Sequence, residues 1–307
     1  ASDLDINGYF VLRAGYFTAP AQMNVRGDWY KYTSHDSFIE GAGKVVFDSN
    51  ANSSVYGGED FHTLELAKST LAWELRIPST GEAECDSYVW TQGTLAVSGG
   101  LFYAHDMVDA VIQGTVNLSG GNITLVQDTA TSLGLRGNLN ISGGEFHIFG
   151  GTPDVVSAIP SGGNASFTMS DGLFYRHGWG IGIYNSAYTF SENITGGIIR
   201  TDGNFYCDRT EFTPAGGTLE LTGTAETYLT MVAGTLHALR TNKPDAWVKL
   251  LTAVTANGTI TVQTGILDLN ANDLHADGGV HVYGILHIDD LASLRMGNMK
   301  YLNVESG

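Results

Sequence analysis

The phrase GTLAVSGG at residues 93–100 recurs in altered form three more times along the chain. Its copies are GTVNLSGG at residues 114–121, GNLNISGG at 137–144 and GNASFTMSDG at 163–172. The closing glycines of the four phrases lie 21, 23 and 28 residues apart. A unit that returns at this interval predicts a stacked repeat architecture, because one such unit cannot bury an apolar face without its neighbours.

Each phrase alternates apolar and polar residues, which is the pattern of a strand with one buried face. In the first copy Leu95 and Val97 share one face, and Ala96 lies on the other. A second apolar strand follows each glycine turn, and its inward positions are Phe102, Ile123, Phe146, Phe174 and Ile199. About two dozen residues hold three short strands and three corners. We therefore predict an all-β fold, a parallel β-helix (β-solenoid) with three short strands per turn.

The repeat continues less regularly beyond the fourth copy. Weaker versions occur at residues 194–197, 229–234, 260–265 and 280–284, and their uneven spacing suggests inserted loops or extra strands. No Pro/Ser/Gly-rich linker separates two regions of different composition. We therefore expect residues 1–307 to form a single β-solenoid.

Acidic residues outnumber basic ones, 32 against 15, for a formal net charge of −17. This balance argues against nucleic acid or an anionic membrane surface as a partner. The apolar runs are too short to insert across a membrane. Cys85 and Cys207 lie about five turns apart, so at roughly 4.8 Å per turn we predict no disulfide between them.

A second signature lies between residues 4 and 66. Its segments are LDINGYFVL at residues 4–12, GYFTAP at 15–20, VRGDW at 25–29, FIEGAGKVVFD at 38–48 and GGEDFHTLEL at 57–66. This region resembles a repeat found in very large secreted surface proteins of Bacteroidetes and related environmental bacteria.

The resemblance implies a right-handed, pectin-lyase-like β-helix. It also implies an extracellular or cell-surface location and a structural or adhesin-like role, with surface glycans among the expected partners. On this basis residues 1–68 are expected to form family-like coils and residues 69–307 the Ser-Gly-Gly coils. This sequence departs from that family in lacking the C-terminal secretion-sorting domain, so we expect either that the domain was removed or that the chain is a fragment.

Residues 278–306 still read as solenoid strands, with no amphipathic helix to cover the last turn. An uncovered turn offers unpaired backbone groups to a further strand. We therefore expect a homo-oligomer or homopolymer: a fibre, sheath or surface-layer subunit that stacks through its solenoid ends. The alternative is a polysaccharide lyase or glycoside hydrolase, because a β-helix can carry either function.

Hydrolases on this scaffold need two carboxylates that converge on one bond. Asp289 and Asp290 are adjacent in sequence, so on a strand they would point to opposite faces. The nine histidines are scattered, and His281 and His287 lack an evident third zinc ligand. We therefore predict no catalytic residues and no enzyme activity.

Three acidic residues alternate along one predicted strand, namely Glu82, Glu84 and Asp86. Their oxygens could hold Ca²⁺, or they could form a solvated acidic edge. No other cofactor is indicated.

An outward row of larger side chains follows from the repeat register, and its members are Tyr103, Thr124, His147, Tyr175 and Arg200. Such a row could bind sugar rings, contact another subunit, or reflect ordinary strand preference on an exposed face. Trp179 begins the segment WGIGIY, which we expect to be an inserted loop or an extra strand. If this segment has a binding function, its aromatic residues would form a platform for carbohydrate. Asn117 and Asn140 each begin an Asn-x-Ser sequon, and they occupy the same outward slot of the repeat.

Overall fold

The computed structural model describes residues 3–32, 37–107, 111–127, 134–150, 157–159, 163–184, 187–297 and 302–304. In this part of the chain the structure is all-β, contains no α-helix, and stacks parallel strands into a β-solenoid. The predicted fold class is therefore confirmed. The chain divides into two compact units, residues 1–150 and 151–307, which are described separately.

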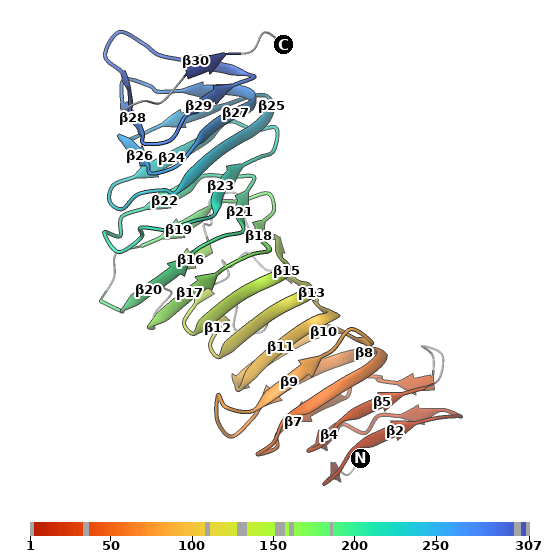
Figure 1. Cartoon of the computed structure of the whole chain (residues 1–307). Coiled ribbons are helices and arrows are strands. Elements are labelled where there is room, and N and C mark those ends of the chain that lie inside the picture. The colour runs from red at the N-terminus through yellow and green to blue at the C-terminus, as the bar shows by residue number, and fades with distance from the viewer. Residues whose placement is uncertain are drawn as a thin grey trace. The chain divides into compact units, whose positions relative to one another are not determined.

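The first unit consists of successive short strands that stack turn upon turn (Figure 1). They are β1 (Leu4–Ile6), β2 (Phe10–Leu12), β3 (Phe17–Thr18), β4 (Gln22–Val25), β5 (Trp29–Lys31), β6 (Phe38–Ile39), β7 (Lys44–Phe47), β8 (Ser53–Ala67), β9 (Glu74–Ile77), β10 (Gly81–Gln92), β11 (Thr94–Ala104), β12 (Val111–Ile112), β13 (Thr115–Gln127), β14 (Gly134–Leu135) and β15 (Asn138–Gly150).

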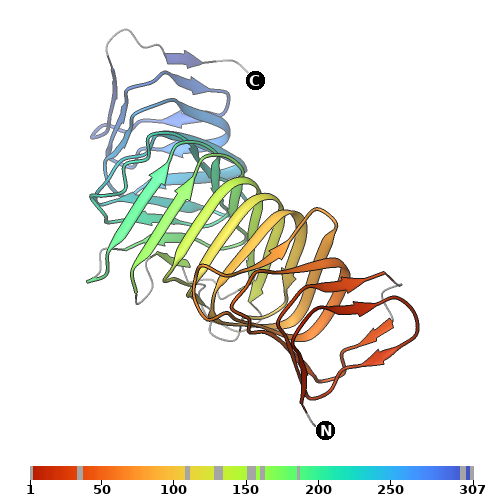
Figure 2. The same ribbon diagram turned by 60° about the horizontal axis from the view of Figure 1, so that its bottom comes forward.

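Each turn of the first unit contributes three strand positions, and every position pairs in parallel with its counterpart in the next turn. β1 pairs with β4 and β4 with β7, β2 pairs with β5 and β5 with β8, and β3 pairs with β6. β8 pairs with both β7 and β10, so stacking is continuous past residue 68. Figure 2 shows these turns as successive layers, coloured red to yellow.

The interior of the first unit is filled by the residues that the repeat phase predicts to point inward. Leu95 and Val97 of β11 are each 1% exposed, and Phe102, further along the same strand, is equally buried. The corresponding residues of later turns are also buried: Val116, Leu118, Ile123, Leu139, Ile141 and Phe146. On the outward side Asn140 Nδ2 donates to Asn117 Oδ1 at 2.8 Å, which confirms that these asparagines share one slot.

The second glycine of the Ser-Gly-Gly phrase is required by the backbone in the copies at residues 114–121 and 137–144. Gly121 adopts φ +75° and Gly144 adopts φ +77°, a region that side-chain-bearing residues rarely enter. A Cβ on Gly121 would also collide with the carbonyl oxygen of Gly100 in the preceding turn. The phrase recurs because each corner stacks directly on the one before it.

The second unit is built in the same way. Its strands are β16 (Ser157–Ile159), β17 (Ala165–Met169), β18 (Leu173–Arg176), β19 (Ile181–Ile183), β20 (Phe190–Ile194), β21 (Ile198–Thr201), β22 (Phe205–Cys207), β23 (Thr218–Leu221), β24 (Thr227–Met231), β25 (Ala238–Leu250), β26 (Val254–Ala256), β27 (Ile260–Asp268), β28 (Asp273–Ala276), β29 (Val280–Val282), β30 (Ile285–His287), β31 (Ser293–Met296) and β32 (Leu302–Val304).

The turns of the second unit are more regular than the sequence suggested. Ile198 pairs with Thr218 and Thr218 with Ala238, so successive turns here are 20 residues long and need no inserted loop. The weaker copies of the phrase also occupy different strand positions. Residues 229–231 belong to β24, which pairs with β22, whereas β27 and β29 continue the row of β23 and β25. The prediction that these weaker copies continue one repeat was wrong. All three strand positions of a turn show the same apolar alternation, so the alternation does not tell them apart.

Candidate functional site

The outward row predicted in the first unit is present. Tyr103 pairs with Thr124, and Thr124 with His147, so these three side chains occupy one row on successive turns. The row also includes Glu84, which pairs with Tyr103 from the preceding turn. Glu84 Oε1 lies 2.8 Å from Nε2 of His105, and the His105 ring lies 4.6 Å from that of Tyr103.

The second unit carries the remaining members of the predicted row. Tyr175 pairs with Arg200, whose guanidinium lies over the tyrosine ring, 5.1 Å from its centroid. Two further members, Glu220 and Arg240, extend the row beyond the predicted residues. Arg200 Nε donates to Glu220 Oε2 at 2.6 Å, and Arg240 Nη1 lies 3.6 Å from Glu220 Oε1.

The hydroxyl of Tyr175 contributes to a second set of contacts. It donates to Asp202 Oδ1 at 2.8 Å, and Thr222 Oγ1 donates to the same oxygen at 2.6 Å. The backbone N–H of Gly178 donates to the other carboxylate oxygen. These hydrogen bonds together outweigh desolvation and hold the pKa of Asp202 below its ordinary value. The row is therefore a network of mutually satisfied side chains rather than a set of groups converging on an empty site.

The three acidic residues of β10 alternate as predicted, but two of them have histidine partners. Glu84 contacts His105, and Asp86 Oδ2 lies 3.0 Å from His62 Nδ1. Among the described residues, no three His, Cys, Asp or Glu side chains gather as metal ligands.

The segment that begins with Trp179 is not an insertion, contrary to expectation. It leads into β19, which pairs with β22 and so occupies a regular strand position of its turn. The half-buried Trp179 is tied to the next turn through its backbone oxygen, which accepts hydrogen bonds from Thr201 Oγ1 at 2.5 Å and Gly203 N at 3.2 Å.

The other candidates for catalysis or metal binding belong to no cluster of three metal-binding side chains in the part of the chain that the structure describes. Asp289 and Asp290 lie in the turn after β30, and Asp289 accepts a hydrogen bond from the N–H of Ala271. His281 and His287 lie on different strands, and His287 Nδ1 contacts Asp268 Oδ1 at 2.9 Å.

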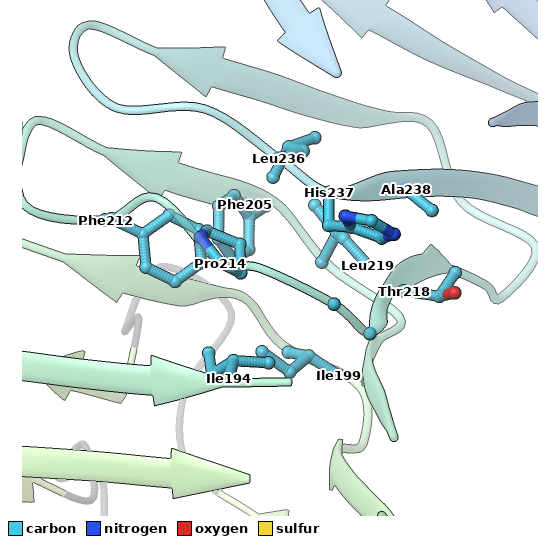
Figure 3. A pocket seen from close by; sticks show the side chains of 12 residues that line it. Ile194, Ile199, Phe205, Phe212, Pro214, Thr218, Leu219, Leu236, His237 and Ala238 are labelled. Carbon is cyan, nitrogen blue, oxygen red and sulfur yellow. The ribbon is translucent and has the colours of Figure 1, made fainter. Parts of the chain in front are cut away.

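Two hollows in the described part of the chain are candidate ligand sites. The first lies in the second unit, where side chains from successive turns point toward one another, with Ile194 and Ile199 on one side and Leu236 and His237 on the other (Figure 3). Its cavity volume is about 10 Å³, room for a single water at most. The second is an open hollow of about 390 Å³ in the first unit, lined by Arg26, Asp48, Ser49 and Asn50.

Buried charged side chains in the first unit were not anticipated from the sequence. Lys31 Nζ donates to Glu59 Oε1 at 2.9 Å, and Trp29 Nε1 donates to Oε2 of the same carboxylate at 3.1 Å. Burial raises the pKa of Glu59 to about 7, against the opposing influence of Lys31. Lys68 is also buried, donates to Ser49 and Ser53, and has its pKa lowered by burial to about 8.

The first unit also carries a cluster of outward tyrosines that was not predicted from the sequence. We call it the tyrosine ladder; its members are Tyr9, Tyr30, Tyr32 and Tyr56. Tyr30 and Tyr56 are cross-strand neighbours of β5 and β8, and their rings stack 4.7 Å apart at an interplanar angle of 6°. The available signal was the alternation of Trp29-Tyr30-Lys31-Tyr32, which places both tyrosines on the same outward face.

The last described turn of the second unit exposes apolar side chains. Val280 and Val282 are 0% and 3% exposed, whereas their partners in the next turn, Leu302 and Val304, are 45% and 66% exposed. Exposed apolar residues of this turn also include Ile285, Ile288, Leu291 and Met296. Among the described residues β30, β31 and β32 each pair on one side only, with β27, β28 and β29.

Comparison with known proteins identifies no relative. No protein-family model matches the chain, and neither a curated protein nor a solved structure shows significant similarity to it. In the described ranges, no helix has the length and apolarity needed to cross a membrane. The chain is thus assigned to the parallel β-solenoid fold, and its function is argued from its own residues.

Proposed function

We propose that this protein is an extracellular structural or adhesive subunit that stacks end to end on a second copy, giving a fibre, sheath or surface layer. The observation that carries the proposal is the apolar surface of the last described turn. Leu302 and Val304 continue rows that are fully buried one turn earlier. A further solenoid turn placed on them would bury these side chains and pair the open strands β30 to β32.

The arrangement of charged groups supports a structural role over catalysis. Arg200 is paired with Glu220, Glu84 with His105, and Lys31 with Glu59. A lyase or glycoside hydrolase would need carboxylates and a base around one hollow. The first hollow described above has no carboxylate in its lining, and the second has one, Asp48, beside Arg26. The extracellular location is part of the proposal and is supported by the resemblance of residues 4–66 to secreted surface repeats.

Sedimentation velocity and negative-stain microscopy of the full chain over a range of concentrations test the proposal. We expect concentration-dependent assemblies with a regular axial repeat. Leu302→Asp combined with Val304→Asp places two charges on the stacking surface and should leave monomers. Val232→Asp combined with Leu251→Asp is the matched control, because these residues are similarly exposed elsewhere in the second unit.

The control variant should assemble like the unmodified chain. The proposal is wrong if the unmodified chain remains monomeric at every concentration. It is also wrong if the Leu302/Val304 variant assembles as readily as the control.

A further inference from the structure

The tyrosine ladder is a compact, rigid aromatic surface on the outward face of β5 and β8. Tyr30 lies at its centre, stacked on Tyr56 at 4.7 Å and on Tyr32 at 6.1 Å, with interplanar angles of 6° and 4°. Tyr9 meets the Tyr30 ring edge-on, with centroids 6.2 Å apart. Tyr9 and Tyr32 are 69% and 65% exposed, so ring surface is open to a ligand.

The strand alternation explains why the rings are held so firmly. Trp29 and Lys31, on either side of Tyr30, point inward and are buried, which fixes the backbone that carries the tyrosines. Tyrosine offers a large contact area at a low cost in conformational entropy, and stacking on neighbours lowers that cost further. The ladder is therefore preorganised for binding.

Polar groups surround the rings. The Tyr30 hydroxyl donates to Asp28 Oδ2 at 3.0 Å, and the other carboxylate oxygen of Asp28 accepts from the N–H of Ser54. The guanidinium of exposed Arg13 lies over the Tyr32 ring, 5.6 Å from its centroid. The surface thus combines open aromatic faces with hydrogen-bond donors and acceptors of both charge signs at its margin.

We propose that the tyrosine ladder binds a neutral saccharide chain. A sugar ring has an apolar C–H face that stacks on an aromatic ring and a hydroxyl edge that hydrogen-bonds to groups such as Asp28 and Arg13. This inference rests on the adhesive part of the proposed function and specifies its ligand class.

The size and charge of the ladder argue against other occupants. Four partly exposed tyrosines offer on the order of half of the ~800 Å² per partner that a stable protein interface uses. Nucleic acid is disfavoured by the net charge of −17 and by Asp28 within the surface. A second copy of the chain is the competing occupant that the experiment must separate.

Affinity electrophoresis in native gels tests the inference. The gels contain hydroxyethylcellulose, xyloglucan or arabinoxylan as neutral probes, and polygalacturonate as the anionic probe. We expect at least one neutral polysaccharide to retard the unmodified chain. Tyr9→Ala combined with Tyr32→Ala should weaken that retardation ~10-fold, because the two most exposed stacking surfaces of the ladder are lost.

Two control variants isolate the ladder. Tyr16→Ala removes a tyrosine that is 81% exposed in the same unit but outside the ladder, and it should bind normally. Tyr9→Phe combined with Tyr32→Phe keeps the rings and should retain most of the binding. The Leu302/Val304 variant, measured in the same gels, separates saccharide binding from end-to-end assembly, since its monomers should still be retarded.

Three results would overturn the inference. The first is that no neutral polysaccharide retards the unmodified chain, whether or not polygalacturonate retards it. The second is equal retardation of the unmodified chain and the Tyr9/Tyr32 alanine variant. The third is loss of self-association in that alanine variant, which would assign the ladder to a contact between copies. The first two results leave stacking through Leu302 and Val304 untouched, and that stacking is tested separately.

Discussion

Lys31 and Glu59 form an ion pair in the interior of the first unit, with Nζ 2.9 Å from Oε1 and each side chain 1% exposed. The two residues are 28 positions apart and meet because β5 and β8 occupy the same strand position in consecutive turns. Trp29, itself fully buried, donates its indole N–H to the second carboxylate oxygen. A largely apolar solenoid core thus holds a charged pair whose partners depend on each other.

Replacing one partner should be far more costly than replacing both. At pH 8, Lys31→Met removes the counter-ion that opposes the rise in the pKa of Glu59, so the folded chain must either bury an unpaired carboxylate or take up a proton. We expect a loss of about 3–5 kcal/mol in the free energy of unfolding. Lys31→Met combined with Glu59→Gln removes both charges and keeps an acceptor for Trp29, so it should recover most of that loss. Urea unfolding followed by tryptophan fluorescence measures both. An unchanged midpoint in the single variant would contradict the prediction.

The stability of the first unit should fall between about pH 4.5 and 7. The pKa of Glu59 is raised from its ordinary 4.5 to about 7, so the folded chain binds more protons than the unfolded chain in this window. The resulting stabilisation is complete below pH 4.5 and is lost as the pH rises through 7, with a slope of at most about 1.4 kcal/mol per unit. Glu59→Gln lacks this titration. The free energy of unfolding of the unmodified chain minus that of Glu59→Gln should therefore decrease with pH in this window. A difference that does not change with pH would contradict the raised pKa of Glu59.

Two adjacent glycines should differ strongly in how much stability the same substitution costs. Gly121→Ala must enter a positive-φ conformation and would collide with the carbonyl of Gly100, so we expect a loss of at least about 2 kcal/mol. Gly120→Ala is the matched control, because its Cβ would meet nothing closer than 3.7 Å and no positive φ is required. Its effect should stay within about 1 kcal/mol. Thermal unfolding of the two variants gives the comparison, and equal losses would count against the corner geometry.

Neither cysteine should react while the chain is folded. Cys85 and Cys207 are both free and buried, one in each unit, and burial raises the pKa of both thiols, that of Cys207 to about 11. Since the thiolate is the reactive species, a disulfide reagent such as dithiobis(nitrobenzoate) at pH 8 should label no thiol in the folded chain. The same reagent in concentrated guanidinium should label both cysteines. Rapid labelling without denaturant would show that at least one thiol is accessible.

The repeat phrase predicted the inward residues well because strand alternation is a local property. Leu95, Val97 and Phe102 are buried as expected, and the same phase correctly aligned Tyr103 with Thr124. The phrase did not predict which strand position a segment occupies. The segment that begins with Trp179 is therefore expected to be an inserted loop or an extra strand, whereas it leads into a regular strand of its turn.

The sequence by itself determined that the chain forms alternating strands, that glycine corners join them, and which side chains face inward. Only the tertiary structure decided which residues meet across turns. Phe10 pairs with Trp29 after 19 residues, but Trp29 pairs with Val55 after 26, because the corners between strands differ in length. Backbone pairing sets this register, and it places Tyr30 on Tyr56 and Lys31 within reach of Glu59. Because strand alternation is indifferent to corner length, neither contact could be deduced from the order of residues alone.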